Sequence, residues 1–203
     1  MRVSGEEQAQ PVLVELQGPL AVIRLNRPHE RNALSISTLV ELDTTFSELT
    51  RRENLKAIIF TGTKDVFASG ANIRELEALT PATAGEFTER GQSLFQKIAN
   101  ARQLTVAAIN GYCMGGGLDL ALACNIRCAS HTAVLAHPGA RLGVITGWGG
   151  TQRLTRLIGA ARALEMFATG KRLTASDALA CGLVTHLHED ALTCALEIAS
   201  RKI

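Results

Sequence analysis

The sequence predicts an α/β protein with a single core domain. Short apolar runs at 57–60 and 106–109 are typical of buried strands, and segments with apolar residues at helical spacing separate them. This alternation is typical of parallel strands that helices connect. The chain has 203 residues, of which 46% are hydrophobic and 20% charged. It is therefore large enough for one sizeable core, and its composition disfavours disordered and fibrous classes.

The first part of the chain predicts a hairpin and then a helix. Residues 1–10 form a polar lead-in, and the core domain spans 11–203. The runs 12–16 and 20–25 are rich in β-forming residues and flank a Gln-Gly-Pro turn, which predicts an antiparallel pair. A helix is predicted next, capped by Ser35 or Ser37. Its apolar positions are Leu39, Val40, Leu42, Phe46 and Leu49.

The middle of the chain predicts a buried strand at 57–60, a loop over 63–71 and a short helix over 73–79. Thr80 and Pro81 then begin a longer helix. The apolar face of this helix carries Phe87, Gly91, Leu94, Phe95 and Ile98.

A second strand at 106–109 runs into a glycine-rich turn over 110–117, which opens a helix over 118–123. The later segments are two strands, a second glycine-rich loop and a helical remainder that contains one last short strand. These predictions cover strands at 126–129 and 133–136, the loop at 138–150 and the last strand at 183–185.

Several classes of function are disfavoured by charge and motif content. The net charge is +2 and no basic window contains aromatic residues, so nucleic acid is a poor candidate partner. No apolar run is long enough to cross a membrane, and the polar start is unlike a signal peptide. The five cysteines lack paired CxxC spacing, which favours reduced thiols and a cytoplasmic location. Dinucleotide, P-loop, serine-hydrolase and zincin motifs are absent, and the spacing of His131 and His137 is a weak metal signal, so no metal site is predicted.

Two glycine-containing segments precede helices, at 68–74 and 115–119. Free N–H groups at a helix start carry the positive end of the helix dipole and suit a carbonyl oxygen that becomes an oxyanion. Glycine also permits close packing of a strand on a helix, and the pattern alone favours neither interpretation.

The same segments carry a family resemblance. FASGANIRE at 67–75, NGYCMGGGLDLA at 110–121 and GWGGTQRL at 147–154 resemble the three signatures of the enoyl-CoA hydratase/isomerase (crotonase) superfamily. Residues 24–34 resemble its first coenzyme A segment. The resemblance implies a crotonase-like (ClpP/crotonase) spiral of ββα units. It also implies that the helices with which family members continue beyond 190–202 are lacking here.

The resemblance implies a role for each matched residue. The N–H groups of Ala71 and Gly116 match the oxyanion hole that stabilises a thioester enolate. Arg31 and Arg74 match the neighbourhood of the phosphates or adenine, although each could equally be a solvated surface charge. The implied coenzyme A contacts are Arg31, Ala33, Leu34, Ala68, Ala71, Asn72, Ile73 and Arg74.

The catalytic positions depart from the hydratase pattern. The two glutamates of the family's hydratases match Asp119, which is one methylene shorter, and Gly139, which has no side chain. For Asp119 the alternative is a carboxylate placed at a helix start by the dipole. Glycine at the second position also occurs in the family's dihydroxynaphthoyl-CoA synthases, but Thr146 departs from the acidic residue of their following loop. Three further residues could face the acyl pocket, although loop packing is the favoured interpretation of each: His137, Arg141 and Trp148.

The resemblance implies an enzyme that stabilises a thioester enolate, an enoyl-CoA hydratase-like protein or an enoyl-CoA isomerase of fatty-acid metabolism. One carboxylate can move a proton between two carbons, so Asp119 alone would suffice for the isomerase. The alternatives are a decarboxylase or hydrolase of the same family and a non-catalytic acyl-CoA-binding or oligomer-forming relative. The implied partners are an acyl-CoA thioester and further copies of the chain, in a trimer or hexamer. No cofactor is expected beyond the coenzyme A of the substrate.

Overall fold

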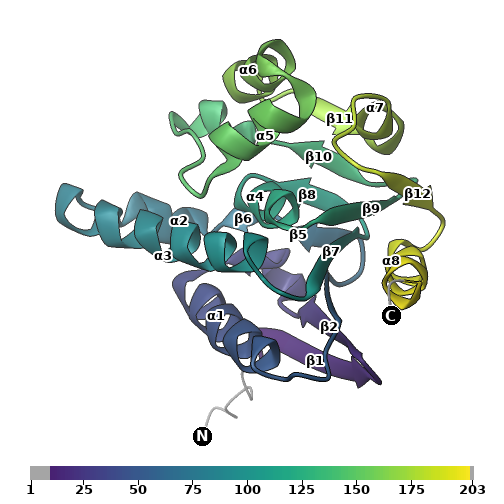
Figure 1. The fold of residues 1–203 in the computed structure, drawn as a ribbon. Coiled ribbons are helices and arrows are strands. Elements are labelled where there is room, and N and C mark those ends of the chain that lie inside the picture. Colours follow the sequence, from purple (N-terminus) through teal and green to yellow (C-terminus); the bar gives the residue numbers. More distant parts are fainter. Residues whose placement is uncertain (1–9, 202–203) are drawn as a thin grey trace, which may run out of the picture.

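The protein is a two-sheet α/β structure, described for residues 10–201 by a computed structural model (Figure 1). The prediction for residues 1–10 lies outside the described residues, apart from Gln10. The larger sheet has the strand order β1-β2-β4-β7-β9-β12. These strands are β1 Val12–Gln17, β2 Leu20–Leu25, β4 Ala57–Thr61, β7 Leu104–Ile109, β9 Ile126–Ser130 and β12 His186–His188.

Parallel pairing holds the larger sheet together, except at its N-terminal edge. β1 is antiparallel to β2, as the predicted hairpin requires, and each later neighbour is parallel. A four-stranded sheet lies beside it in the order β11-β10-β8-β5, and a two-stranded parallel pair joins β3 to β6. The strands of these smaller sheets are β3 Ala33–Leu34, β5 Val66–Ala68, β6 Gly70–Ala71, β8 Tyr112–Met114, β10 Val134–Ala136 and β11 Arg172–Thr174.

The chain alternates between the two main sheets before it enters a helix. β4 and β5, β7 and β8, and β9 and β10 each place the first strand in the larger sheet and the second in the smaller one. This repetition is the ββα spiral that the resemblance implied. The helical segments are η1 Pro28–Glu30, α1 Ile36–Thr50, α2 Ile73–Glu77, α3 Pro81–Ala99, α4 Gly116–Ala123, η2 Pro138–Leu142, α5 Gly150–Ile158, α6 Ala160–Thr169, α7 Ala175–Ala180 and α8 Ala191–Ser200.

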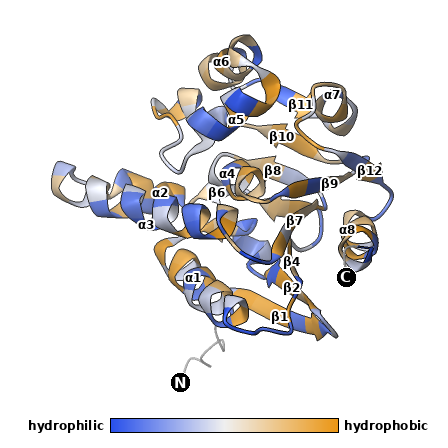
Figure 2. Ribbon diagram, viewed as in Figure 1, coloured by the Kyte–Doolittle hydropathy of each residue, from blue (hydrophilic) through white to orange (hydrophobic). Residues whose placement is uncertain are grey.

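Helix starts follow the local sequence. Ser35 caps α1, because its side chain accepts a hydrogen bond from the N–H of Thr38. Thr80 and Pro81 begin α3, and the buried residues of α3 are the five that its spacing predicted. Hydrophobic residues accordingly line the strands and the inner sides of the helices, whereas the outer side of α3 is largely polar (Figure 2).

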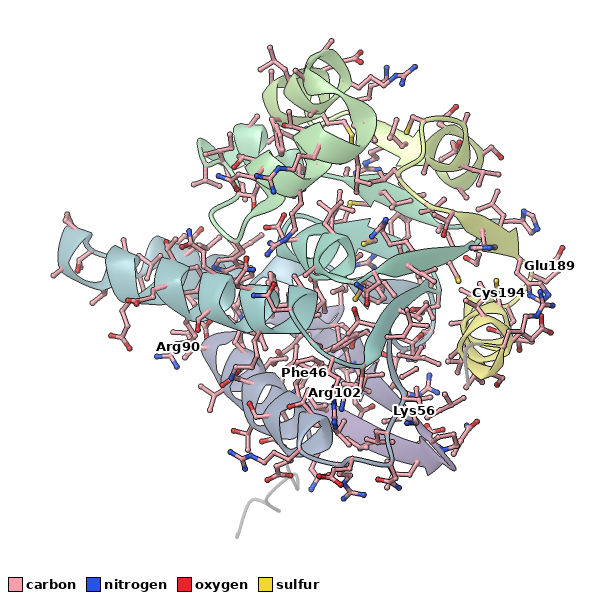
Figure 3. The ribbon with its side chains drawn as sticks, in the orientation of Figure 1. Phe46, Lys56, Arg90, Arg102, Glu189 and Cys194 are labelled. Atoms are coloured by element: carbon pink, nitrogen blue, oxygen red, sulfur yellow. The ribbon has the colours of Figure 1, made fainter. Side chains whose placement is uncertain are left out.

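Two apolar clusters form the core. The larger cluster joins α1, α3, α4, α5 and both main sheets, and Phe46 from α1 lies in it with its ring centroid 5.8 Å from that of Phe60 (Figure 3). The smaller cluster lies between α8 and strands of the larger sheet, with Cys194 and Ala195 on the helix side. The larger sheet is therefore covered on both faces, as the continuous apolar runs predicted.

Four short-range predictions were wrong. The predicted loop over 63–71 contains β5 and β6, and the predicted turn over 110–117 contains β8. The last strand pairs at 186–188 instead of 183–185, and the predicted helical remainder also contains β11. Each strand concerned has only two or three residues, which is too short for an alternating pattern, so pairing with distant strands decides its position.

Candidate active site

A cavity of about 260 Å³ lies where α2, α3, the start of α4 and the 137–148 loop meet (Figure 1). Its walls are mainly aliphatic and aromatic, with Ile73, Leu76 and Phe87 on one side and Phe167 of α6 on another. Backbone of the two glycine segments reaches it at Gly70–Ala71 and Gly115–Gly116. An apolar cavity with a few convergent polar groups is the usual form of a small-molecule site.

The two glycine segments approach each other closely at this cavity. Gly70 has a φ of +97°, and a Cβ atom there would lie 2.9 Å from the carbonyl oxygen of Met114 and 3.1 Å from the nitrogen of Gly116. A Cβ atom on Gly116 would lie 3.5 Å from the nitrogen of Ala71. The backbone nitrogens of Ala71 and Gly116 are therefore neighbours. Gly116 begins α4, so its N–H has no acceptor within the helix.

Close packing, the other interpretation of these glycines, also applies. A Cβ atom on Gly117 would overlap the backbone of Ala68, so α4 lies directly on β5. The same contact sets the start of α4 beside β6. The packing of α4 on β5 and the placement of the Gly116 N–H group therefore both follow from this contact.

The two segments matched to coenzyme A binding also lie side by side. Ala33 and Leu34 in β3 pair with Gly70 and Ala71 in β6. The N–H of Ser69 donates to the carbonyl oxygen of Arg31 at 3.1 Å. The structure thus brings together segments that are almost 40 positions apart in the sequence.

These matched residues differ in what they can offer a ligand. The side chains of Ala33, Leu34 and Ala68 are buried, which leaves their backbone. Asn72 uses its side chain to cap α2. Ile73 is 52% exposed and lines the cavity. The two arginines are exposed, Arg74 on α2 and Arg31 with its guanidinium 5.2 Å from the ring centre of Tyr112.

Asp119 lies behind the cavity wall and does not line the cavity. Its side chain is 0% exposed, and burial raises the pKa of the carboxyl from 3.8 to about 7. Three groups favour the charged form and moderate this rise in pKa: the Thr146 hydroxyl, which donates to Oδ2, the positive charge of Arg153 and the backbone of Trp148. Gly150, the first residue of α5, leaves room for Oδ1, because a Cβ atom there would overlap that oxygen.

His137 lines the cavity and also contacts Asp119. Its Nε2 lies 3.4 Å from Oδ1 of Asp119, and neither atom has a hydrogen-bond partner among residues 10–201. The ring packs 5.1 Å from the ring of Phe167. Burial lowers the pKa of His137 to about 4. Because burial raises one pKa and lowers the other, the two side chains do not carry two opposite charges near neutral pH.

Gly139 lines the cavity but has no space for a side chain. A Cβ atom there would lie 2.5 Å from the carbonyl oxygen of Val144, whose N–H donates to the carbonyl of Gly139 at 3.0 Å. The place of a second carboxylate is thus occupied by backbone. Arg141, in the same loop, is exposed and is not among the lining residues.

Trp148 closes the cavity between α3 and α4. Its ring centroid lies 5.3 Å from that of Phe87 and 5.7 Å from that of Phe95, edge-on to the latter. Gly91 and Gly116 leave room for the indole, which a Cβ atom at either position would overlap. The sequence indicated that Trp148 and His137 could face the pocket but favoured loop packing for each, whereas in the structure both line the cavity. The signal for His137 was its place two residues before Gly139, the position that the resemblance matches to a glutamate.

Neither a metal site nor a membrane-spanning helix is found among the described residues. No group of three or more His, Cys, Asp or Glu side chains within residues 10–201 is placed to hold a metal ion. None of the described helices is both long and apolar enough to span a membrane.

Comparison with known proteins shows the family to which the chain is similar. The family model described as Enoyl-CoA hydratase/isomerase matches residues 15–201. A Mycobacterium tuberculosis protein named Probable enoyl-CoA hydratase echA8 is 40% identical over 176 residues, which are 87% of this chain and 68% of the relative. The Short-chain-enoyl-CoA hydratase of Clostridium acetobutylicum is 35% identical over 193 residues, 94% of this chain and 74% of the relative.

Solved structures give the same result for the fold. The crystal structure of an enoyl-CoA hydratase from Bacillus anthracis matches with a TM-score of 0.90 and 33% identity, over 95% of this chain and 76% of that one. The structure of Pseudomonas aeruginosa DspI also matches with a TM-score of 0.90, over 98% of this chain and 83% of that one. The predicted fold class is thereby confirmed. The chain belongs to the enoyl-CoA hydratase/isomerase family.

Proposed function

We propose that the protein is an enzyme that acts on an acyl-CoA thioester and that it hydrates a 2-enoyl thioester or moves the double bond of a 3-enoyl thioester. The observation that carries this proposal is the meeting of the Ala71 and Gly116 N–H groups at an apolar cavity. Relatives named enoyl-CoA hydratase, at 35% to 40% identity, support the same substrate class.

In this proposal the two N–H groups hold the thioester oxygen while it gains negative charge. Such donors act strongly in a cavity with few competing waters, and loss of one typically costs about 2.7–4 kcal/mol of transition-state stabilisation. The apolar walls and Trp148 favour a dry acyl site. The neighbouring β3 and β6 segments would bind coenzyme A mainly through backbone, with Arg31 and Arg74 near its phosphates.

The blocked space at Gly139 favours a reaction that one proton-transfer site can complete. Double-bond isomerisation meets this condition, because the proton removed from one carbon returns to another. Hydration meets it where the group that takes a proton from water returns that proton to Cα. Decarboxylation, thioester hydrolysis and acyl-CoA binding without catalysis are the remaining alternatives.

The test measures two reactions on the native chain and on Asp119→Ala. Loss of the conjugated enoyl absorbance reports hydration of crotonyl-CoA, and gain of that absorbance reports isomerisation of a 3-enoyl-CoA. We expect native turnover of at least one substrate and a large fall in kcat for the variant, because the variant loses the buried carboxyl beside the cavity.

Exchange of the Cα protons of butyryl-CoA in D₂O adds a direct measure of enolate formation. We expect exchange with the native chain, since the oxyanion site stabilises the enolate whichever reaction follows. If acyl-CoA binds but neither turnover nor exchange is observed, the proposed enzymatic activity is contradicted and the non-catalytic alternative is supported.

We also propose a homo-oligomer, a trimer or hexamer, with no cofactor beyond the coenzyme A of the substrate. A reducing compartment such as the cytoplasm is supported by the five cysteines, all of which are free thiols in the structure. Light scattering after size-exclusion chromatography measures the assembly directly, and a monomer would contradict it.

A further inference from the structure

One titratable side chain reaches the cavity. Of the described residues that line it, only His137 has a titratable side chain. The other polar side chains in the lining do not titrate near neutral pH: the hydroxyl groups of Ser69, Thr88 and Thr146 and the indole of Trp148. A reaction that moves protons in this space therefore has one direct candidate.

His137 is held from behind by a fixed carboxylate. Oδ1 of Asp119 faces Nε2 at 3.4 Å, and Oδ2 accepts the Thr146 hydroxyl. Asp119 lies in the first turn of α4 and against the first residue of α5, so two helices fix its position. A separation of 3.4 Å is long for a hydrogen bond, but catalytic hydrogen bonds are often long before substrate binds.

The tautomer follows from this contact. Nε2 is buried and lies 3.4 Å from a carboxylate oxygen of Asp119, so we assign the ring proton to Nε2. The lone pair then lies on Nδ1, the ring nitrogen that is not among the buried unpartnered atoms of the described residues. This is the arrangement in which a carboxylate orients an imidazole for proton transfer.

We propose that His137 moves the protons of the reaction and that Asp119 positions it, so that one imidazole–carboxylate pair does the work of two separate carboxylates. This inference rests on the proposed function and deepens it. It accounts for the backbone at Gly139, because a second acid is not required at that position.

Hydration balances through this single pair. His137 Nδ1 takes a proton from water, the water oxygen bonds to Cβ, and the π electrons of the double bond move to give the enolate, whose oxygen lies at the Ala71 and Gly116 N–H groups. The Nδ1 proton then passes to Cα, the enolate collapses to the thioester, and the imidazole is neutral again. The product is the 3-hydroxyacyl thioester. Isomerisation uses the same nitrogen to move a proton from C2 to C4.

The charges around the pair set its pH dependence. Asp119 is faced by His137, by Thr146 and Arg153, and by the buried thiol of Cys113 in β8. The raised pKa of Asp119, about 7, means that the pair gains a proton as pH falls through this range. Asp119 must be ionised to stabilise the imidazolium, so kcat/KM should rise with pH up to about 7 and then level off.

The first experiment compares the native chain with His137→Phe, His137→Gln and the control His131→Gln, whose histidine is exposed and outside the cavity. We expect kcat to fall by about 10²- to 10⁴-fold in both His137 variants, which is the usual contribution of general acid–base catalysis, and to stay unchanged in the control. KM should change less than kcat. In His137→Ala, added imidazole should restore part of the activity.

The second experiment tests the positioning role of Asp119 with Asp119→Asn. An amide carries no charge to stabilise the imidazolium, so we expect a lower kcat and a shift of the acid limb of the pH profile to lower pH. Nitrogen NMR of His137 in the native chain should show the Nε2–H tautomer. It should also show that the imidazole titrates at lower pH in Asp119→Asn.

Each contrary result of these experiments contradicts a different claim. An active native chain whose kcat survives His137→Phe contradicts the proton-transfer role and leaves the proposed function standing. An unchanged pH profile and unchanged His137 titration in Asp119→Asn contradict the positioning role. A native chain that turns over neither thioester contradicts the proposed function itself, and with it this role of the pair.

Discussion

At the scale of single residues, a backbone carbonyl decides what position 139 can hold. The Val144 oxygen occupies the space into which a Cβ atom of residue 139 would point. The loop is closed at the same place by a hydrogen bond between the two residues. This loop therefore requires glycine at position 139.

We accordingly expect Gly139→Glu not to create a two-carboxylate hydratase. The overlap should cost about 1–3 kcal/mol in stability, the usual range for overpacking, and turnover should fall because the loop also carries His137 and Thr146. The control Ala140→Glu adds the same side chain at an exposed neighbour. Thermal unfolding and enoyl-CoA turnover measure both variants, and a gain in hydration by Gly139→Glu would contradict this account.

At the scale of elements, the start of α4 is positioned by its contact with β5. Gly117 allows the helix to lie on the backbone of Ala68, and this places Gly116 beside Ala71. A displacement of α4 away from β5 would therefore move the Gly116 N–H away from the Ala71 N–H. Catalytic geometry at this site thus depends on helix-to-strand packing.

The substitution Gly117→Ala tests this dependence. Its methyl group should push α4 away from β5, and we expect a stability loss of about 1–3 kcal/mol and a clear fall in kcat. The control Gly85→Ala lies in α3, where a Cβ atom meets nothing within 4 Å. We expect the control to gain about 0.5–1 kcal/mol with unchanged kcat. Denaturant unfolding and steady-state kinetics measure both, and full activity in Gly117→Ala would disprove the dependence.

At the scale of the whole molecule, a buried arginine joins the larger sheet to the segment before β12. Arg127 in β9 is 5% exposed and donates to the carbonyl oxygens of Cys124 at 2.8 Å and Leu183 at 2.8 Å. The first acceptor lies at the end of α4, and the second lies before β12. One side chain thereby ties the end of α4 and β9, which are neighbours in the sequence, to a segment that lies 56 positions further along.

Arg127→Met should therefore destabilise the whole fold. Each buried carbonyl left without a donor costs about 1–3 kcal/mol, and Met fills part of the volume without donating. The control Arg102→Met changes an exposed arginine, for which we expect a change within about 0.5 kcal/mol (Figure 3). Urea unfolding monitored by circular dichroism measures both variants. Equal midpoints for the two would contradict the structural role of Arg127.

Much of the fold could be predicted because its signals are local. The hairpin of β1 and β2, the cap and apolar stripe of α1, and the buried face of α3 depend on residues that are neighbours along the chain. The glycine segments likewise indicated where backbone approaches a ligand or another element. The short strands β5, β8 and β11 left no such signal, because their hydrogen bonds go to strands far away in sequence.

The sequence by itself determined the family and the ββα order, and its resemblance to the family predicted the two N–H groups of the candidate site. Only the tertiary structure decided that Asp119 lies behind the cavity, that His137 stands between it and the acyl space, and that Val144 fills the place beside Gly139. The physical reason is that side-chain burial and contact depend on how three loops and two helix starts pack together. No periodicity or spacing within a single segment carries that information.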